Sequence, residues 1–491
     1  MRLSRWQQLF RLGRAALRKL VALTLRSEAL VERLRRQVAT LRQRVRALER
    51  QVKELKGRLA LNSTNSGKPP ASDGLAKATP KPKSLRQRSG RRPGGQKGHP
   101  GRTLQPVTAP DQVCVHRLDR CSCGACHGAS LRGQPVLDYA RRQVFELPQK
   151  PLEVTEHQAE IKCCPVSGRR VTAAFPEGVN APAQYGPRFK AQMLYFNVQQ
   201  FIPYQRLSQL CEDLYGQPLS EATIAAANQQ TYDHLAAFEQ RVVTLLPQAP
   251  VVGCDESGLR VAKTLHWLHV LSHPALTFYG VHPKRGTEAM DYFGILPRCK
   301  NWLLHDHWKP YFAYGGLHAL CNEHHLRELK FLHEEHQEAW AQQMSTFLLE
   351  RLAWRKDHGA LNEQQFKRVH ARYRAILRLG RRRHPRRVGR AAQSKAANLL
   401  DRLEAFDLNV LAFTIFEEVP FTNNGAERDL RMEKTRQKIS GCFRTLEGAR
   451  VFARIRSYIS TCRKQRQNIL DALEKAITGN PFIPSAPAKG P

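Results

Sequence analysis

The stretch that decides the fold is residues 251–306, which read VVGCDESGLRVAKTLHWLHVLSHPALTFYGVHPKRGTEAMDYFGILPRCKNWLLHD. Short apolar runs rich in β-branched and aromatic residues are separated here by turn residues, which is typical of strands. The predicted elements are strands at 251–255, 265–272 and 276–282, a helix at 286–296 and a strand at 301–306. The first and the last of these strands both end in an acidic residue.

Three strands, a helix and a further strand form the opening of a ribonuclease-H-like sheet. In that layout the first and fourth strands lie side by side, so we expect Asp255 and Asp306 to lie close together. Two carboxylates at neighbouring strand ends cannot both ionise at low cost unless a cation lies between them. Carboxylate oxygens suit Mg²⁺ or Mn²⁺. The sequence therefore predicts an α/β fold with a metal-binding pair of acids.

Two alternatives compete with this interpretation. Glu256 could replace Asp255, but successive side chains of a strand point to opposite faces, so only one of the two can face the metal; Asp255 fits the predicted strand end. His305 and His307 flank Asp306 and could indicate a histidine-bound transition metal. Both should point away from Asp306 if the strand continues.

A third acid must come from further along the chain. The segment 422–432 is predicted to begin a helix, with Glu427 in its first turns. Asp429 lies about 200° further round that helix and would face elsewhere. By spacing alone Glu427 remains one candidate among several, the others being Glu417, Glu418, Asp429 and Glu433.

The composition points to a polyanionic partner. The 491 residues carry a formal charge of +37, and 41% hydrophobic residues exclude global disorder. Residues 1–60 hold 17 Lys and Arg against 4 acids, and residues 62–104 hold 10 against 1. Arginines interrupt any apolar signal near the N-terminus, and no run of about 18 apolar residues exists to span a membrane. Nucleic acid is the partner that this charge favours.

The first predicted segment, residues 1–61, is a basic coiled coil resembling a leucine zipper. Val at one heptad position and Leu at the other favour a parallel two-stranded coiled coil, hence a homodimer. The heptad residues are Val31, Leu34, Val38, Leu41, Val45, Leu48, Val52 and Leu55. A single amphipathic helix packed on its own protein is the alternative.

Residues 62–110 form a predicted flexible linker, because their Pro, Gly, Ser and Lys content cannot bury a core. It is either a passive tether or a segment that follows the DNA backbone. For the second case its candidate DNA-binding residues are Arg91, Arg92 and Lys97.

A cysteine-rich segment follows at residues 111–175. Cys123 and Cys126 have the C-x₂-C spacing of a zinc knuckle. Downstream, Cys163 and Cys164 precede Ser167, which stands where a fourth thiolate is expected. These four cysteines are the candidate Zn²⁺ ligands, unless the site is degenerate or is completed by a nearby residue, the choices being Cys121, His127 and His157.

Residues 176–247 are predicted to be helical. Two short helices separated by a turn containing Gly216 fit a DNA-binding helix-turn-helix. An ordinary helical hairpin fits equally well.

Longer motifs resemble the IS66 family of bacterial insertion-sequence transposases. They are Asp255-Glu-Ser-Gly, His305-Asp-His-Trp-Lys-Pro-Tyr311, Cys321-Asn-Glu-His-His-Leu-Arg-Glu-Leu329, Val419-Pro-Phe-Thr-Asn-Asn-Gly-Ala-Glu-Arg-Asp-Leu-Arg431 and Ser440-Gly-Cys-Phe-Arg444. The resemblance covers nearly the whole chain, including the zipper, the linker, the zinc segment and the block beginning at Tyr204.

The resemblance implies a DDE transposase whose triad is Asp255, Asp306 and Glu427. It also implies that the ribonuclease-H-like catalytic domain, residues 248–317 and 406–450, is interrupted by a helical insertion at 318–405. A helical segment and tail at 451–491 complete the chain. Three positions depart from the family pattern: Ser257 replaces Thr, Glu323 replaces Ala, and the second zinc knuckle lacks its last Cys. The triad is unaffected.

The expected function is binding of insertion-sequence ends, followed by metal-dependent strand cleavage and strand transfer. Lys309, Arg428 and Arg431 are candidate phosphate contacts. The family further implies accessory proteins encoded by the same element and a bacterial, cytoplasmic location at the nucleoid. The alternative is a catalytically inactive DNA-binding regulator derived from a transposase, but such a protein would not need to retain all three acids.

Overall fold

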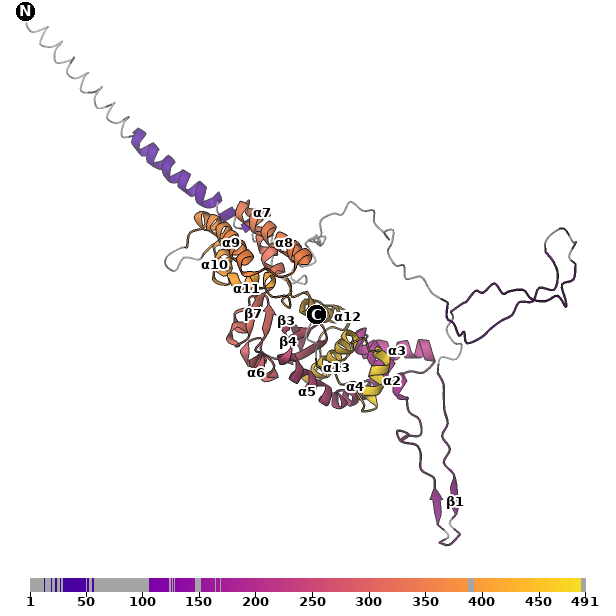
Figure 1. Cartoon of the computed structure of the whole chain (residues 1–491). Helices are drawn as coiled ribbons and strands as arrows, with labels where there is room; N and C mark the ends of the chain where they lie inside the picture. Colours follow the sequence, from indigo (N-terminus) through magenta and orange to yellow (C-terminus); the bar gives the residue numbers. More distant parts are fainter. Residues whose placement is uncertain are drawn as a thin grey trace, which may run out of the picture. The chain divides into compact units, whose positions relative to one another are not determined.

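A computed structural model describes residues 30–49, 106–122, 129–145, 152–163, 169–386 and 393–486, together with isolated positions before and between these ranges. The chain divides into two units, residues 83–186 with 204–224, and residues 1–82 with 187–203 and 225–491 (Figure 1). No helix in the described part of the chain is both long enough and apolar enough to cross a membrane.

Where the structure describes the smaller unit, it contains little regular structure. Strands β1 (Ile161–Cys163) and β2 (Arg170–Thr172) pair as a short antiparallel hairpin whose residues are all exposed. Helix α3 (Tyr204–Tyr215) also belongs to this unit and buries Leu207 and Cys211. The chain then enters α4 (Glu221–His234), which begins in this unit and ends in the larger one.

The larger unit is built on a mixed five-stranded sheet with the strand order β5-β4-β3-β6-β7. Its strands are β3 (Val251–Val261), β4 (Thr264–His273), β5 (Leu276–His282), β6 (Trp302–His305) and β7 (Leu317–Leu320). The first three strands form an antiparallel meander, while β6 lies parallel to both β3 and β7. The predicted adjacency of the first and fourth strands is confirmed, and the sheet is consistent with a ribonuclease-H-like domain.

Helices α12 (Asn424–Ser440) and α13 (Leu446–Lys464) pack against the antiparallel strands of the sheet. The backbone N–H groups of Thr277 and Tyr279 on edge strand β5 donate to the hydroxyl oxygens of Thr461 and Ser457 on α13. The outer side of an edge strand presents N–H groups that no other strand pairs. The hydroxyl groups of α13 accept hydrogen bonds from two of them, so this helix can cover the strand without leaving these groups unpaired. Helices α5 (Ala236–Leu245), α13 and α14 (Ile469–Ile477) share the apolar core on this side.

A helical insertion follows β7, and its apolar side chains share a second hydrophobic core with residues of the sheet such as Leu304, Ala319 and Leu320. Its helices are α7 (Asn322–His336), α8 (Ala339–His358), α9 (Glu363–Arg383), α10 (Lys395–Ala405) and α11 (Asp407–Leu411). Figure 1 shows them gathered into a bundle beside β7. Ion pairs from Arg381 to Asp401 and Glu404 join α9 to α10, so part of the basic stretch near the end of α9 is neutralised within the bundle.

Three boundaries differ from the expectations. Strand β3 continues to Val261, so Asp255 lies within it rather than at its end. Residues 317–320 form edge strand β7, although 318–405 was expected to be helical throughout; a four-residue strand leaves too short an apolar run to recognise. The expected boundary at residue 450 lies inside α13, whose buried face belongs to the sheet core.

Of the predicted N-terminal coiled coil, only the helical secondary structure is confirmed. Residues 30–49 are helical, and the apolar heptad side chains are about half exposed, as Leu41 is at 57%. Residues 62–105 lie outside the described part of the chain. The homodimeric coiled coil therefore remains a prediction.

Candidate active site

The pairing of β3 with β6 sets the positions of the first two acids. The two strands run parallel, with Gly253 opposite Leu304 at the last paired position. Asp255 and Asp306 each lie two residues beyond that pair, so the register brings them to the same level on adjacent chains. Neighbouring strands lie about 4.8 Å apart, so the two carboxylates come from backbones in near contact.

The electrostatics of Asp255 agree with this arrangement. Burial raises the pKa of its carboxyl well above the ordinary value, and the negative charges of Glu256, Asp306 and Glu427 raise it further. A hydrogen bond of 2.8 Å from the Glu256 backbone N–H to Asp255 Oδ1 acts in the opposite direction. The candidate acids are therefore near enough to destabilise one another's charged forms, as expected of a site that a cation completes.

Asp306 follows the last residue of β6 and is held by a turn. Its Oδ1 accepts a 2.9 Å hydrogen bond from the backbone N–H of Trp308. The neighbouring His305 is fully buried, with its Nε2 at 3.1 Å from His318 Nδ1, and burial lowers its pKa to about 3. His307 packs its ring against Phe406. Both histidines lie in an aromatic cluster, which argues against a histidine-bound metal at Asp306.

Glu256 lies on the other face of β3 and is already occupied. One carboxylate oxygen accepts a 2.9 Å hydrogen bond from Arg285 Nε, and the other accepts one from the Tyr311 hydroxyl. The Arg285 guanidinium in turn lies over the Trp308 ring, 4.1 Å from its centre. Because successive strand side chains alternate between faces, Glu256 lies in this hydrogen-bonded network and Asp255 faces the candidate site.

Helix α12 approaches β3 at a glycine. A Cβ on Gly253 would clash with the side-chain oxygen of Asn423, the residue before the helix. The Asn423 amide nitrogen donates at 2.8 Å to the carbonyl oxygen of Cys254, next to Asp255. This close contact places the first turn of α12, and with it Glu427, beside the acids of the sheet.

Glu427 is turned toward the first turns of α7. Its Oε1 lies 3.8 Å from Cys321 Sγ and 3.9 Å from His324 Nδ1, and its Oε2 lies 3.7 Å from an Arg327 guanidinium nitrogen. Arg327 also pairs with Glu323 at 3.5 Å. In the described part of the chain, Cys321, His324 and Glu427 are the group whose ligand atoms all lie within 4.8 Å of one another.

Cys321, His324 and Arg327 were not among the site residues that the sequence predicted. The sequence did contain a signal, because the Cys-x₂-His spacing at a helix start brings both side chains to the same end of the helix. His325, next along, is buried and its Nδ1 lies 3.2 Å from Asn322 Oδ1.

The other acids considered for the third position lie elsewhere. Asp429 Oδ2 pairs with Lys464 at 2.7 Å and accepts a hydrogen bond from Ser272. Glu433 is fully buried and pairs with Arg436 at 2.8 Å. Two further acids, Glu417 and Glu418, are exposed on the loop before α12.

Three of the six candidate DNA-binding residues lie in the described part of the chain. Lys309, Arg428 and Arg431 are exposed, and the described residues offer none of them an ion-pair partner. Arg428 directly follows Glu427. The remaining basic candidates Arg91, Arg92 and Lys97 and the candidate zinc ligands Cys123, Cys126 and Cys164 lie outside the described residues, while Cys163 is an exposed residue of β1.

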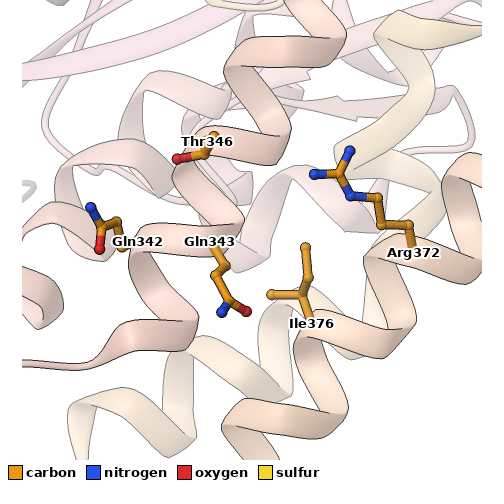
Figure 2. A pocket seen from close by; sticks show the side chains of 5 residues that line it. All are labelled: Gln342, Gln343, Thr346, Arg372 and Ile376. Carbon is orange, nitrogen blue, oxygen red and sulfur yellow. The ribbon is translucent and has the colours of Figure 1, made fainter.

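An open hollow of about 260 Å³ lies on the insertion, between α8 and α9. Figure 2 shows its lining side chains, which are Gln342, Gln343, Thr346, Arg372 and Ile376. Arg372 pairs with Glu350 at 2.8 Å. No acid, histidine or cysteine lines the hollow, so it offers no set of groups for catalysis.

The sheet order and the acids on its adjacent parallel strands are consistent with the DDE class of ribonuclease-H-like domains. The comparison with protein families then makes the assignment specific. Residues 182–451, more than half of the chain, match the family described as Transposase IS66 family, and the chain belongs to that family. Membership implies phosphoryl transfer on DNA, and the DDE class implies a divalent metal.

Two further results concern the remainder of the chain. Residues 22–105 match a family of unknown function, DUF6444. This match covers residues 22–61 of the predicted coiled coil and most of the basic linker, and its description adds no activity. No curated protein matches the chain.

Proposed function

We propose that this protein binds the ends of an insertion sequence and catalyses their cleavage and transfer to target DNA, with Asp255, Asp306 and Glu427 as the metal-binding triad. The observation that carries the proposal is the β3–β6 register, which brings Asp255 and Asp306 to the same level on adjacent strands. Burial and the neighbouring acids, Glu427 among them, raise the pKa of the Asp255 carboxyl, which supports a shared site. Protein interiors keep such groups charged only beside a cation. Oxygen ligands of this kind suit Mg²⁺ or Mn²⁺.

In this proposal the three acids would together hold two metal ions. Asp255, between the other two, would contact both, while Asp306 and Glu427 would each hold one. The chemistry that such ions supply is activation of a water or a DNA 3′-hydroxyl and neutralisation of the charge on the leaving 3′-oxygen. The turn at Trp308 orients Asp306, and the bond from Asn423 to β3 orients the start of α12. Cleavage and joining then need no covalent bond between enzyme and DNA.

The remaining partners follow from charge and sequence pattern. Lys309, Arg428 and Arg431 would contact phosphates beside the acids, and Arg91, Arg92 and Lys97 would contact the backbone further along. The helices α3 and α4 would serve as the helix-turn-helix, and the cysteine segment would hold Zn²⁺. Homodimerisation through residues 1–61, accessory proteins of the same element and a place at the bacterial nucleoid complete the proposal.

The test is cleavage of DNA that carries the element ends, in Mg²⁺, by the full chain and by Asp255→Asn and Asp306→Asn. Both variants should bind the DNA as the wild type does and leave it uncut. Glu418→Gln, which changes an exposed acid outside the site, is the matched control and should cut normally. Cleavage by either aspartate variant would overturn the triad, and binding without cleavage by the wild type would instead support an inactive regulator.

A further inference from the structure

The cluster formed by Cys321, His324 and Glu427 is not explained by the proposed reaction. A DDE site needs hard oxygen ligands, whereas a thiol and an imidazole prefer softer metals. We infer that these three residues form a binding site for Zn²⁺ or a similar transition-metal ion, and that an ion bound there inhibits DNA cleavage by withdrawing Glu427 from the aspartates. The second part of this inference rests on the proposed function; the first does not.

The spacing of the ligand atoms fits a tetrahedral ion. Bonds of about 2.3 Å to sulfur and 2.0–2.1 Å to nitrogen or oxygen place tetrahedral ligand atoms roughly 3.3–3.6 Å apart. Glu427 Oε1 lies 3.8 Å from the sulfur and 3.9 Å from the imidazole nitrogen. All three ligand atoms lie within 4.8 Å of one another. Side-chain rotations that move these atoms by about 1 Å would therefore close the site.

The ligands are supplied by anchored helix starts. Cys321 is the residue before α7, and His324 lies in its first turn. The backbone N–H of Asn322 donates to Phe421 O at 3.1 Å, and that of Asn423 donates to Cys321 Sγ at 3.2 Å. These bonds join the start of α7 to the segment that leads into α12. Ligands held on rigid elements form more accurate metal sites than ligands on loops.

One polar atom in the cluster lacks a partner. His324 Nδ1 is buried, and no described residue forms a hydrogen bond with it. A buried polar atom left without a partner destabilises the folded state, because it has lost its hydrogen bonds to water. The Glu427 carboxylate lies 3.9 Å from this nitrogen, which is too far for a hydrogen bond. A metal ion would satisfy the nitrogen, the sulfur and the oxygen together, with a fourth position left for water.

Binding would occur by exchange of the thiol proton for the ion. The Cys321 sulfur would release its proton to solvent and form a bond to zinc, because a coordinating thiol is deprotonated. Glu427 would then share its Oε1 with an ion fixed to α7, instead of with one held by Asp255. Since strand cleavage is proposed to need Glu427 at the aspartates, zinc and catalytic magnesium would compete for this one carboxylate.

The experiment measures binding first, with Co²⁺ as a spectroscopic substitute for zinc. Full-length wild type, Cys321→Ala and the control Cys462→Ala are titrated, and thiolate-to-cobalt absorption is recorded. Cys462 is likewise buried in a helical core but has no part in the site. Any ion held by the N-terminal cysteines is common to all three proteins, so the wild type and the control should bind one more ion per chain than Cys321→Ala. Equal binding by all three would overturn the inference.

The second measurement separates the inference from the proposed function. Zn²⁺ is titrated into the cleavage assay at constant excess Mg²⁺, and each protein is compared with its own rate without zinc. Loss of an outer partner of a metal ligand already weakens affinity 10–100-fold, so loss of Cys321 should raise the zinc concentration for half-inhibition by about 100-fold. His324→Gln serves as a second variant if Cys321→Ala is poorly folded. Equal inhibition of the wild type and both variants would overturn the regulatory half. A wild type that binds the extra cobalt but never cleaves DNA would overturn only the proposed reaction.

Discussion

Helix α12 carries acidic residues on two faces, and the two faces differ in how closely a cation pairs with each acid. On one face Asp429 pairs with Lys464 at 2.7 Å, and Glu433 pairs with Arg436 at 2.8 Å. On the other face Glu427 has its nearest cation, Arg327, at 3.7 Å. Within one helix, therefore, two carboxylates are neutralised by short contacts and a third is not.

This difference distinguishes carboxylates that stabilise the fold from a carboxylate that can bind a metal. A buried carboxylate that the protein itself neutralises contributes to the fold and has little capacity left for a ligand. A carboxylate that lies near other acids and makes only a long contact with a cation adds little to stability and is available to a metal. The comparison predicts that substitutions on the two faces affect different measurements.

Glu427→Gln should give the largest change, and the change should be in activity alone. Removal of a metal-binding charge costs several kcal/mol of transition-state stabilisation, which corresponds to a decrease of about 10³-fold or more in the rate of Mg²⁺-dependent cleavage. Because its contacts to α7 are long, unfolding by urea should change by less than about 1 kcal/mol. An active Glu427→Gln protein, or one that fails to fold, would remove the distinction between the faces.

Asp429→Asn should produce the reverse. It leaves the largely buried Lys464 without its carboxylate. Breaking a fully buried pair from one side costs about 3–5 kcal/mol, and because Lys464 keeps its bonds to Ser272, His273 and Leu276 the loss should lie at or below the lower end of that range. We expect a clearly lower free energy of unfolding in urea, with the remaining folded protein still cleaving DNA. Normal stability together with loss of cleavage would show that Asp429, rather than Glu427, is the third acid.

The sequence predicted the half of the site that depends on strand pattern. Asp255 and Asp306 each follow a short apolar run, and the order of strands was sufficient to expect them on neighbouring strands of one sheet. The alternation within β3 also explains why Glu256 faces Arg285 and Tyr311. These features repeat every two residues, so they can be recognised along the chain.

The other half depends on contacts between distant segments. Glu427 could not be distinguished from its neighbours by spacing, because its position is set by the bond from Asn423 to β3, which joins residues 169 positions apart. Cys321 and His324 have a local spacing signal, but only the folded chain brings the start of α7 to α12 and places them beside Glu427. Strand β7 was missed because four residues give too weak a pattern.

The pH dependence of the free energy of unfolding provides a smaller test of the face of α12 that carries Asp429. Its partner Lys464 also acts on His273. Burial, and secondly the charge of Lys464, lower the pKa of His273 to about 4. As the pH falls below about 6.5, the unfolded chain takes up a proton that the folded chain excludes, so the folded state loses stability between pH 6.5 and 4. At about 1.36 kcal/mol per pKa unit, the loss between pH 7.5 and 4.5 is about 2–3 kcal/mol.

His273→Gln isolates that contribution, because glutamine does not titrate. Urea unfolding of both proteins at several pH values should give curves that converge in acid by about 2–3 kcal/mol. A constant difference between the two across this range would show that His273 titrates normally and is not held neutral beside Lys464.

Gly253→Ala should have the smallest effect on stability, and it tests how the contact between β3 and α12 positions Glu427. The added methyl group would meet the Asn423 side chain, so the start of α12 must move away from β3. Overpacking costs about 1–3 kcal/mol, and the gain from a stiffer unfolded chain offsets part of it, which leaves about 1–2 kcal/mol in urea unfolding. Cleavage should fall by more than this loss of stability explains, since a displacement of 1 Å at a catalytic group can cost 10²-fold. Gly441→Ala, a change at a glycine with open space around it and a φ of 68°, is the control for strain without displacement of Glu427. If the two alanine variants lose stability and activity in the same proportion, the contact between Gly253 and Asn423 does not position the third acid.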